Sequence, residues 1–190
     1  MLAFPKPIHY AQQVLKSCIK KGDVVVDATL GNGHDALFLA KLVGGQGHVI
    51  GFDVQAEAVL VSTKRMSDEE VSHFSFHHLG HEQMERVIRS ESLPLAAVMF
   101  NLGYLPNADK SVITRESTTI CALDAAQRML KVGGVISVMC YPGHVGGDQE
   151  SESVSKWTSD LERSHFRVVK YALHNASNSP PFLILIEKLR

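Results

Sequence analysis

The chain has 190 residues, of which 45% are hydrophobic and 21% are charged, and its formal net charge is −1. This length allows one buried core and is too short for two full domains, so we expect a single domain over residues 1–190. The sequence has no run of roughly 20 apolar residues, no signal-peptide pattern and no basic excess for a broad nucleic-acid-binding surface, so we expect a cytoplasmic protein without a membrane partner.

Short apolar strands alternate with amphipathic helices along the chain. Apolar residues at helical spacing follow Pro7, which suits a first helical turn, and Gly22 ends this segment. The continuous apolar run at residues 24–26 is typical of a strand that is covered on both faces. In chain order, we predict helices over residues 8–20, 34–43, 55–66, 82–89, 118–130 and 148–163, and strands over residues 24–26, 48–53, 73–77, 95–101, 135–141, 166–172 and 182–187.

This alternation predicts an α/β fold: a doubly wound, mostly parallel sheet of seven strands with helices on both faces. The last two strands have no helix between them, so we expect them to pair as a C-terminal antiparallel hairpin. A Rossmann-like, seven-stranded sheet that ends in this way resembles the class I methyltransferase fold.

A glycine-containing turn follows the first strand, at the edge of the sheet where ligands of such folds bind. It runs from Asp27 to Asp35 with the sequence DATLGNGHD. Gly31 and Gly33 permit a tight turn and a close approach of the backbone to a ligand. Asp53 ends the second strand, where an acidic side chain can accept hydrogen bonds from both ribose hydroxyls.

The turn also fits the G-x-G-x-x-A pattern of dinucleotide-binding proteins, so a nicotinamide- or flavin-dependent oxidoreductase stays open. Asp27 would repel a pyrophosphate and attract a methionine ammonium, and Asp35 would oppose a phosphate at the start of the next helix. The run at residues 130–134 also resembles the turn at that place in many class I methyltransferases. We therefore favour S-adenosylmethionine as the cofactor, with these candidate cofactor-binding residues: Asp27, Thr29, Gly31, Asn32, Gly33, Asp35, Asp53, Gln55, His81 and Glu82.

The loop after the third strand flanks the adenine in this fold, and His81 or Glu82 can accept a hydrogen bond from its exocyclic amine. His77 and His81 would share a metal only on a helix, whereas this segment is predicted as strand and turn, so we expect no metal site. The three cysteines are far apart in apolar runs. This pattern predicts buried free thiols rather than disulfides or a zinc site.

The fourth strand ends in the segment NLGYLP, residues 101–106. Its place matches the Asn/Asp-Pro-Pro-Tyr element of methyltransferases that act on amino nitrogens. In that element the Asn side chain and a backbone carbonyl accept hydrogen bonds from the amine, and the aromatic residue packs on the base. Here Leu102 and Gly103 replace the two prolines. We predict Asn101 and Tyr104 as catalytic residues; the alternative is a polar loop with Tyr104 half-buried.

The fifth strand ends in Tyr141, Pro142, Gly143 and His144, which should face the same pocket. His144 is a candidate catalytic base, because imidazole titrates near neutral pH. The alternative is a histidine on a surface loop.

The segments DATLGNGHD, FDVQ, FNLGYLP, YPGH and NSPPF, taken in order, resemble a small bacterial group labelled rRNA methylases. Characterised relatives methylate the aminomethyl nitrogen of 5-aminomethyl-2-thiouridine at the tRNA wobble position. The resemblance implies the same S-adenosylmethionine-dependent activity here, with the tRNA anticodon region as partner. It also implies a stand-alone catalytic domain that can form a homodimer.

Without an appended RNA-binding module, RNA must be held by local features. Lys6, Lys110 and Arg115 are candidates for phosphate contacts, although each can equally be an ordinary solvated charge. Methylation of rRNA or of a small molecule, a nicotinamide-dependent reductase and a nucleotide-sensing protein without catalysis remain as alternatives.

Overall fold

The structure is a computed structural model, and it describes residues 4–88, 94–103, 113–143, 145–176 and 178–190. Its centre is one seven-stranded sheet with the order β3-β2-β1-β4-β5-β7-β6. The strands are β1 (Val24–Asp27), β2 (His48–Asp53), β3 (Phe74–His78), β4 (Leu95–Asn101), β5 (Leu130–Cys140), β6 (Phe166–Tyr171) and β7 (Phe182–Lys188).

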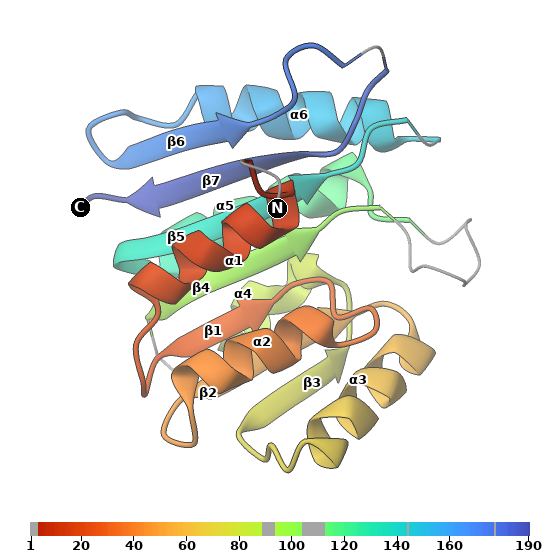
Figure 1. Cartoon of the computed structure of the whole chain (residues 1–190), viewed down its shortest axis with the longest axis vertical. Coiled ribbons are helices and arrows are strands. Elements are labelled where there is room, and N and C mark those ends of the chain that lie inside the picture. The colour runs from red at the N-terminus through yellow and green to blue at the C-terminus, as the bar shows by residue number, and fades with distance from the viewer. Residues whose placement is uncertain (1–3, 89–93, 104–112, 144, 177) are drawn as a thin grey trace.

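Strands β1 to β5 pair in parallel, and β7 pairs antiparallel with both β5 and β6. The predicted doubly wound sheet and its closing antiparallel hairpin are therefore confirmed. The order along the chain reverses between β1 and β4, and the carboxyl ends of the parallel strands meet at one edge of the sheet (Figure 1). This edge is where an open α/β sheet binds its ligands.

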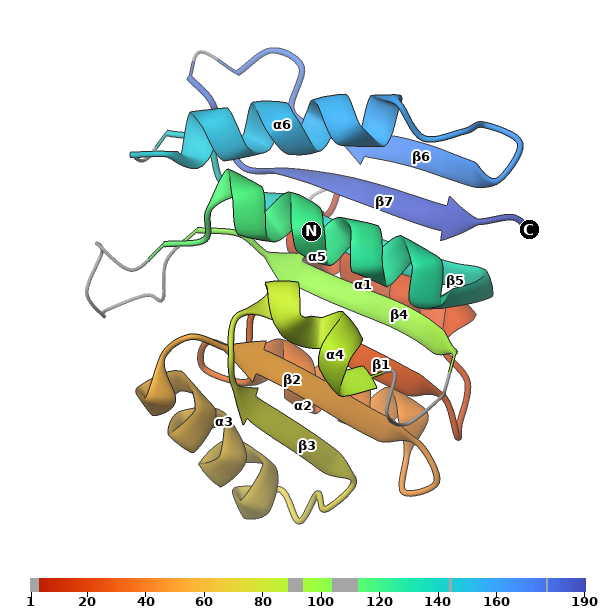
Figure 2. The same cartoon turned by 180° about the vertical axis from the view of Figure 1, so that it is seen from behind.

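Helices cover both faces of the sheet, as Figures 1 and 2 show from opposite sides. One face packs against α1 (Pro7–Cys18), α2 (His34–Val43) and α3 (Ala56–Asp68), and the other against α4 (Met84–Ile88), α5 (Glu116–Met129) and α6 (Gly147–Ser159). Successive strand residues alternate between the two cores. Val25 of β1 packs with α1 and α2, whereas its neighbours Val24 and Val26 pack with the opposite layer. Burial on both faces explains the continuous apolar run of this strand.

Two predicted segments differ from the observed elements. The helix expected over residues 82–89 is divided into a 3₁₀ turn, η1 (His81–Gln83), and the short α4. The fifth strand was expected to start at residue 135 but starts at Leu130. Its pairing with β4 jumps from Leu95–Leu130 to Ala97–Val135, so the intervening residues bulge out of the ladder. Gly133, with a φ of +76°, supplies the left-handed backbone that this bulge needs.

The three cysteines are free thiols, but the prediction that all of them are buried is wrong. Cys140 is buried in β5, Cys18 is half-buried, and Cys121 is exposed because α5 directs Ala122, Ala125 and their neighbours toward the core instead. Among the residues that the structure describes, no helix is both long and apolar enough to cross a membrane.

Candidate functional site

A cavity of about 780 Å³ lies at the carboxyl ends of β1, β2 and β4. Its walls come from the turn after β1, the end of β2, the loop after β3 and the end of β4, with α1 and the start of α5 across the opening. Seven of the candidate site residues from the first two strand ends and β4 line it: Thr29, Gly31, Asn32, Asp35, Asp53, Gln55 and Asn101. The cavity therefore sits where the change of strand order leaves a crevice.

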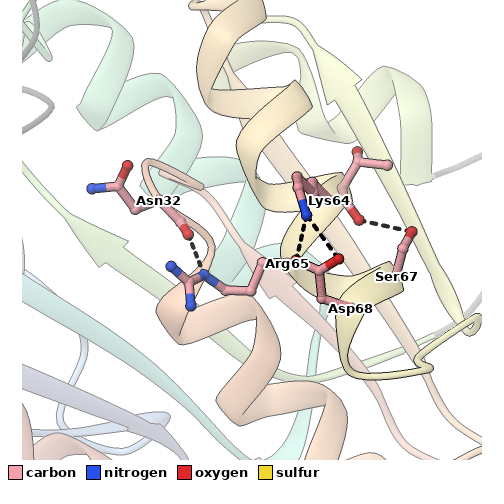
Figure 3. A network of polar contacts seen from close by, with 6 residues as sticks. Asn32, Lys64, Arg65, Ser67 and Asp68 are labelled. Atoms are coloured by element: carbon pink, nitrogen blue, oxygen red, sulfur yellow. Dashed lines mark hydrogen bonds and ion pairs between the residues drawn. The ribbon is translucent and has the colours of Figure 1, made fainter.

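The turn after β1 is held from outside by α3. Gly31 and Gly33 have φ angles of +49° and +74°. Ser62 Oγ donates a hydrogen bond to the Gly31 carbonyl at 3.1 Å. Arg65 Nε donates to the Asn32 carbonyl at 2.6 Å, as Figure 3 shows. These side chains bind the two carbonyls on the side of the turn that packs against α3. The opposite side of the turn faces the cavity.

Gly33 is required both by its backbone angle and by the close approach of α3. A β-carbon at this position would lie 2.8 Å from the Ser62 Cα. Gly33→Ala should therefore destabilise the protein by about 1–2 kcal/mol from the left-handed backbone alone. We expect a fall in melting temperature of about 2–8 °C. Gly45→Ala is the matched control, because nothing lies within 4 Å of its added carbon; equal melting temperatures for the two variants would contradict this account.

Asp53 joins the second strand to the same turn. Its Oδ2 accepts a hydrogen bond from the Gly31 N–H and its Oδ1 from the Gln55 N–H, both at 2.9 Å. A carboxylate offers about four acceptor positions, so each oxygen keeps capacity for a further donor from a ligand. Asp53 thus stabilises the turn through these hydrogen bonds and also provides a hydrogen-bond acceptor at the cavity wall.

Asp27 is fully buried and lies behind the cavity wall rather than on it. Its Oδ1 accepts from the Thr29 N–H at 3.1 Å, and its Oδ2 has no hydrogen-bond partner among the described residues. Burial, and next the negative charge of Asp35, raise the pKa of Asp27 well above the ordinary carboxyl range. The direct contact with a methionine ammonium that the sequence suggested would require this oxygen to become accessible.

The raised pKa makes Asp27 a source of pH-dependent stability. In the unfolded chain it ionises near pH 4, whereas the folded protein holds its proton to higher pH. Stability should therefore fall as the pH rises from about 4 toward the raised pKa. Asp27→Asn keeps the shape and cannot ionise, so its unfolding free energy should fall less between pH 5 and pH 9 in urea titrations. Parallel curves for the two proteins would show that Asp27 ionises freely in the folded state.

Asn101, at the end of β4, is held by the turn after β1 and by α2. Its backbone N–H donates to Thr29 Oγ1 at 2.8 Å, and its side-chain Nδ2 donates to Asp35 Oδ2 at 2.5 Å. Gln12 of α1 reaches the other oxygen of Asp35 with a longer contact of 3.4 Å. The carboxamide of Asn101 therefore meets the cavity in one orientation.

His81 and Glu82 line the cavity after β3. His81 is buried, and burial lowers its pKa, which favours the neutral ring. Its Nδ1 lies 3.2 Å from the Ala28 carbonyl, which can only accept, so Nδ1 carries the proton. The unprotonated Nε2 is then a buried acceptor without a partner among the described residues. Glu82 folds back over Gly80, where an added β-carbon would collide with its carboxylate.

A buried carboxylate that the sequence did not reveal connects the cavity lining near the end of β4 with α5 and α6. Glu150 of α6 is 2% exposed and accepts hydrogen bonds from Thr114 Oγ1 at 2.8 Å and Thr119 Oγ1 at 2.6 Å. Thr114 Oγ1 in turn accepts from the Gly103 N–H at 2.7 Å. Glu150 thereby joins α5 and α6 to Gly103 and Thr114, which both line the cavity.

Comparison with known proteins identifies the family. A family model described as "Putative rRNA methylase" matches residues 49–187. The chain belongs to this family. The sheet order and this membership both agree with the class I methyltransferase fold and with S-adenosylmethionine as cofactor. The membership also rejects the alternative of a nicotinamide-dependent reductase. The chain is an S-adenosylmethionine-dependent methyltransferase.

Individual relatives match over nearly the whole chain. The "tRNA (mnm(5)s(2)U34)-methyltransferase, chloroplastic" of Arabidopsis thaliana is 37% identical over 96% of this chain and 70% of its own length. A crystal structure titled "putative rRNA-methylase" from Clostridium thermocellum is 40% identical, with a TM-score of 0.95 over 99% of this chain and 100% of its own. A Streptococcus mutans methyltransferase structure in complex with SAH is 34% identical, with a TM-score of 0.89 over 98% and 99% of the two chains.

The residues around the cavity fit such a cofactor. Asp53 and Glu82 place acidic side chains in the lining, which suits a ligand with a sulfonium and an ammonium group. The buried Nε2 of His81 can accept a hydrogen bond from an exocyclic amine, and Asp53 has acceptor capacity left for hydroxyls. Among the residues that the structure covers, no three His, Cys, Asp or Glu side chains gather to hold a metal.

The structure brings most of the predicted site residues together. Of the cofactor candidates, Asp27 and Gly33 are buried behind the wall, and the other eight line the cavity. Tyr104, His144 and Lys110 lie outside the described residues. Arg115 is exposed at the cavity edge, whereas Lys6 is exposed but does not line the cavity.

Helix α1 contributes three lining residues that the sequence analysis missed: Ile8, His9 and Gln12. Tyr141, which was expected to face the pocket at the end of the fifth strand, also lines the cavity. Helix α1 was predicted simply as a helix. Because α1 precedes the first strand, no pattern around the glycine turn could place it at the cavity.

Proposed function

We propose that the chain transfers a methyl group from S-adenosylmethionine to the aminomethyl nitrogen of 5-aminomethyl-2-thiouridine at the wobble position of tRNA. The observation that carries this proposal is the Asn101 carboxamide at the cavity wall. Its Nδ2 is committed to Asp35, so Oδ1 is the atom left to accept a hydrogen bond from an amine. The identity with the Arabidopsis tRNA methyltransferase supports tRNA as the substrate class.

Methyl transfer depends mainly on the position of the acceptor nitrogen relative to the methyl carbon. Bound S-adenosylmethionine would supply an electrophilic methyl group on a positively charged sulfur. The acceptor nitrogen must present its lone pair to that carbon, and the amine then releases one proton to solvent or to a base. An Asn101 Oδ1 that accepts one amine N–H directs the lone pair away from the amide and limits the rotation of the nitrogen, which is where an enzyme gains most in such a transfer.

RNA would approach where exposed polar side chains line the cavity. Arg115, His9 and His34 are exposed lining residues at the starts of α5, α1 and α2. Arg115 supplies a full positive charge for a phosphate, and the histidines add polar donors. We propose the anticodon region as the part of tRNA that binds, because the wobble nucleoside must enter a cavity with walls on several sides.

The test is methyl transfer by the purified protein to tRNA that carries 5-aminomethyl-2-thiouridine. Nucleoside mass spectrometry should show conversion to the 5-methylaminomethyl nucleoside, dependent on S-adenosylmethionine. Bulk rRNA and tRNA lacking the aminomethyl group serve as controls. Methylation of rRNA, with the aminomethyl nucleoside left unchanged, would reject the proposed substrate and leave the methyltransferase assignment intact.

A further inference from the structure

Asp35, which the sequence analysis treated as a cofactor ligand, contacts Asn101, the residue proposed to bind the acceptor nitrogen. It lies in the first turn of α2, and its two oxygens receive amide donors from two other elements. Asn101 Nδ2 of β4 donates at 2.5 Å and Gln12 Nε2 of α1 at 3.4 Å. A carboxylate has no proton to donate, so the neighbouring amide must turn its nitrogen toward it. This contact determines that Oδ1, rather than Nδ2, of the Asn101 carboxamide points away from Asp35.

Two amide donors favour the ionised form of Asp35. Burial raises the pKa of Asp35, whereas the hydrogen bonds from Asn101 and Gln12 act against that shift. Asp27, fully buried behind the wall, is the nearby group that disfavours a second negative charge. Because Asp27 is the more deeply buried of the two, it retains the proton more readily and leaves Asp35 as the acceptor.

We infer that Asp35 is a positioning residue for methyl transfer: it holds the Asn101 carboxamide so that Oδ1 accepts a hydrogen bond from the acceptor nitrogen. This inference rests on the proposed amine substrate. Thr29 fixes the Asn101 backbone N–H, and Asp35 fixes the side chain, so the amide has no freedom left. Without Asp35 the amide can rotate and present its N–H₂ to an amine N–H, which places donor against donor and misaligns the lone pair.

This role differs measurably from a contact with the cofactor. Asp35→Ala should slow the single-turnover rate of methyl transfer by about tenfold to a hundredfold, because a misplacement of about 1 Å at the reacting nitrogen has an effect of that size. The affinity for S-adenosylhomocysteine, measured by calorimetry, should change by less than about threefold, since the positioned group acts on the acceptor.

A double-mutant cycle with Asn101→Ala provides the decisive readout. If Asp35 acts through Asn101, removal of Asp35 in the Asn101→Ala background should change the rate by less than about threefold, because coupled residues are not additive. Asp68→Ala is the matched control: it removes an exposed aspartate of α3 that pairs with Lys64 and does not line the cavity, and it should leave the rate and the cycle unchanged.

A second measurement does not require turnover. The side-chain amide protons of Asn101, assigned by their absence in the Asn101→Ala spectrum, should exchange with solvent at least about tenfold faster in Asp35→Ala than in the wild-type protein. Normal melting of Asp35→Ala would show that the variant is folded, and a poorly folded variant is replaced by Asp35→Asn, which keeps the volume and weakens the charge-assisted bond.

The outcomes separate the two proposals. If the wild-type protein methylates a different acceptor, the proposed substrate is wrong, and the same cycle on that acceptor still tests Asp35. Equal slowing by Asp35→Ala in both backgrounds, a parallel loss of S-adenosylhomocysteine affinity, a normal rate, or unchanged exchange of the Asn101 amide would each overturn the positioning role.

Discussion

Asn101→Ala should slow methyl transfer about a hundredfold while leaving the affinity for S-adenosylhomocysteine within about twofold. The side chain lies at the carboxyl end of β4 and lines the cavity, and its Nδ2 is already bound to Asp35. Removal of the amide deletes the acceptor for the substrate amine and leaves the cofactor-facing residues of β1 and β2 in place. The loss should therefore appear in the chemical step rather than in cofactor binding.

Single-turnover rates at saturating S-adenosylmethionine, on tRNA that carries 5-aminomethyl-2-thiouridine, measure this effect directly. Asn175→Ala is the matched control, because this exposed asparagine lies between β6 and β7 and does not line the cavity. A normal rate for Asn101→Ala would show that the acceptor nitrogen is held by other groups. An equal loss of rate and of S-adenosylhomocysteine affinity would indicate a general collapse of the cavity.

The alternation of elements was predictable because each strand has a local signal. A strand covered on both faces is mostly apolar, and β1, β2 and β4 show this in their continuous apolar runs before a polar residue at the carboxyl end. The start of β5 was not predictable in the same way. Gly133 and Gly134 indicate a turn, and only the pairing with β4 shows that the chain bulges there and continues the strand.

The cavity lining at the ends of β1 and β2 was predictable because its residues follow strand ends directly. Thr29, Gly31 and Asp53 are all within a few residues of a buried strand, so the topology alone brings them to one edge. The depth of a side chain was not predictable: Asp27 and Thr29 are two residues apart, yet one is sealed behind the wall and the other lines the cavity.

The cavity lining near the end of β4 depends on tertiary contacts between segments that are distant in the sequence, which local sequence patterns do not encode. Gln12 is 23 residues from Asp35, and Glu150 is 36 residues from Thr114. An acidic residue in the first turn of α6 is explained equally well by the helix dipole, so Glu150 gave no separate signal in the sequence. Its burial and its two threonine donors are visible only in the folded chain.

Asp53→Ala should weaken S-adenosylhomocysteine binding by about 1.5–3 kcal/mol, the range for hydrogen bonds to a charged group. This corresponds to a loss of affinity of about tenfold to 150-fold. Two effects add. The cavity loses an acidic acceptor at the end of β2, and the Gly31 and Gln55 N–H groups lose the carboxylate that holds them, each at 2.9 Å.

Calorimetry of wild-type, Asp53→Ala and Asp68→Ala proteins with S-adenosylhomocysteine tests this expectation. Asp68 is an exposed aspartate in an ion pair with Lys64, so its removal should leave the affinity unchanged. Asp53→Asn resolves the two effects further. Its amide keeps one acceptor oxygen but turns an N–H₂ toward one of the two backbone N–H groups, so its loss should approach that of Asp53→Ala if bracing the turn dominates. Unchanged affinity in both Asp53 variants would place the cofactor away from the end of β2.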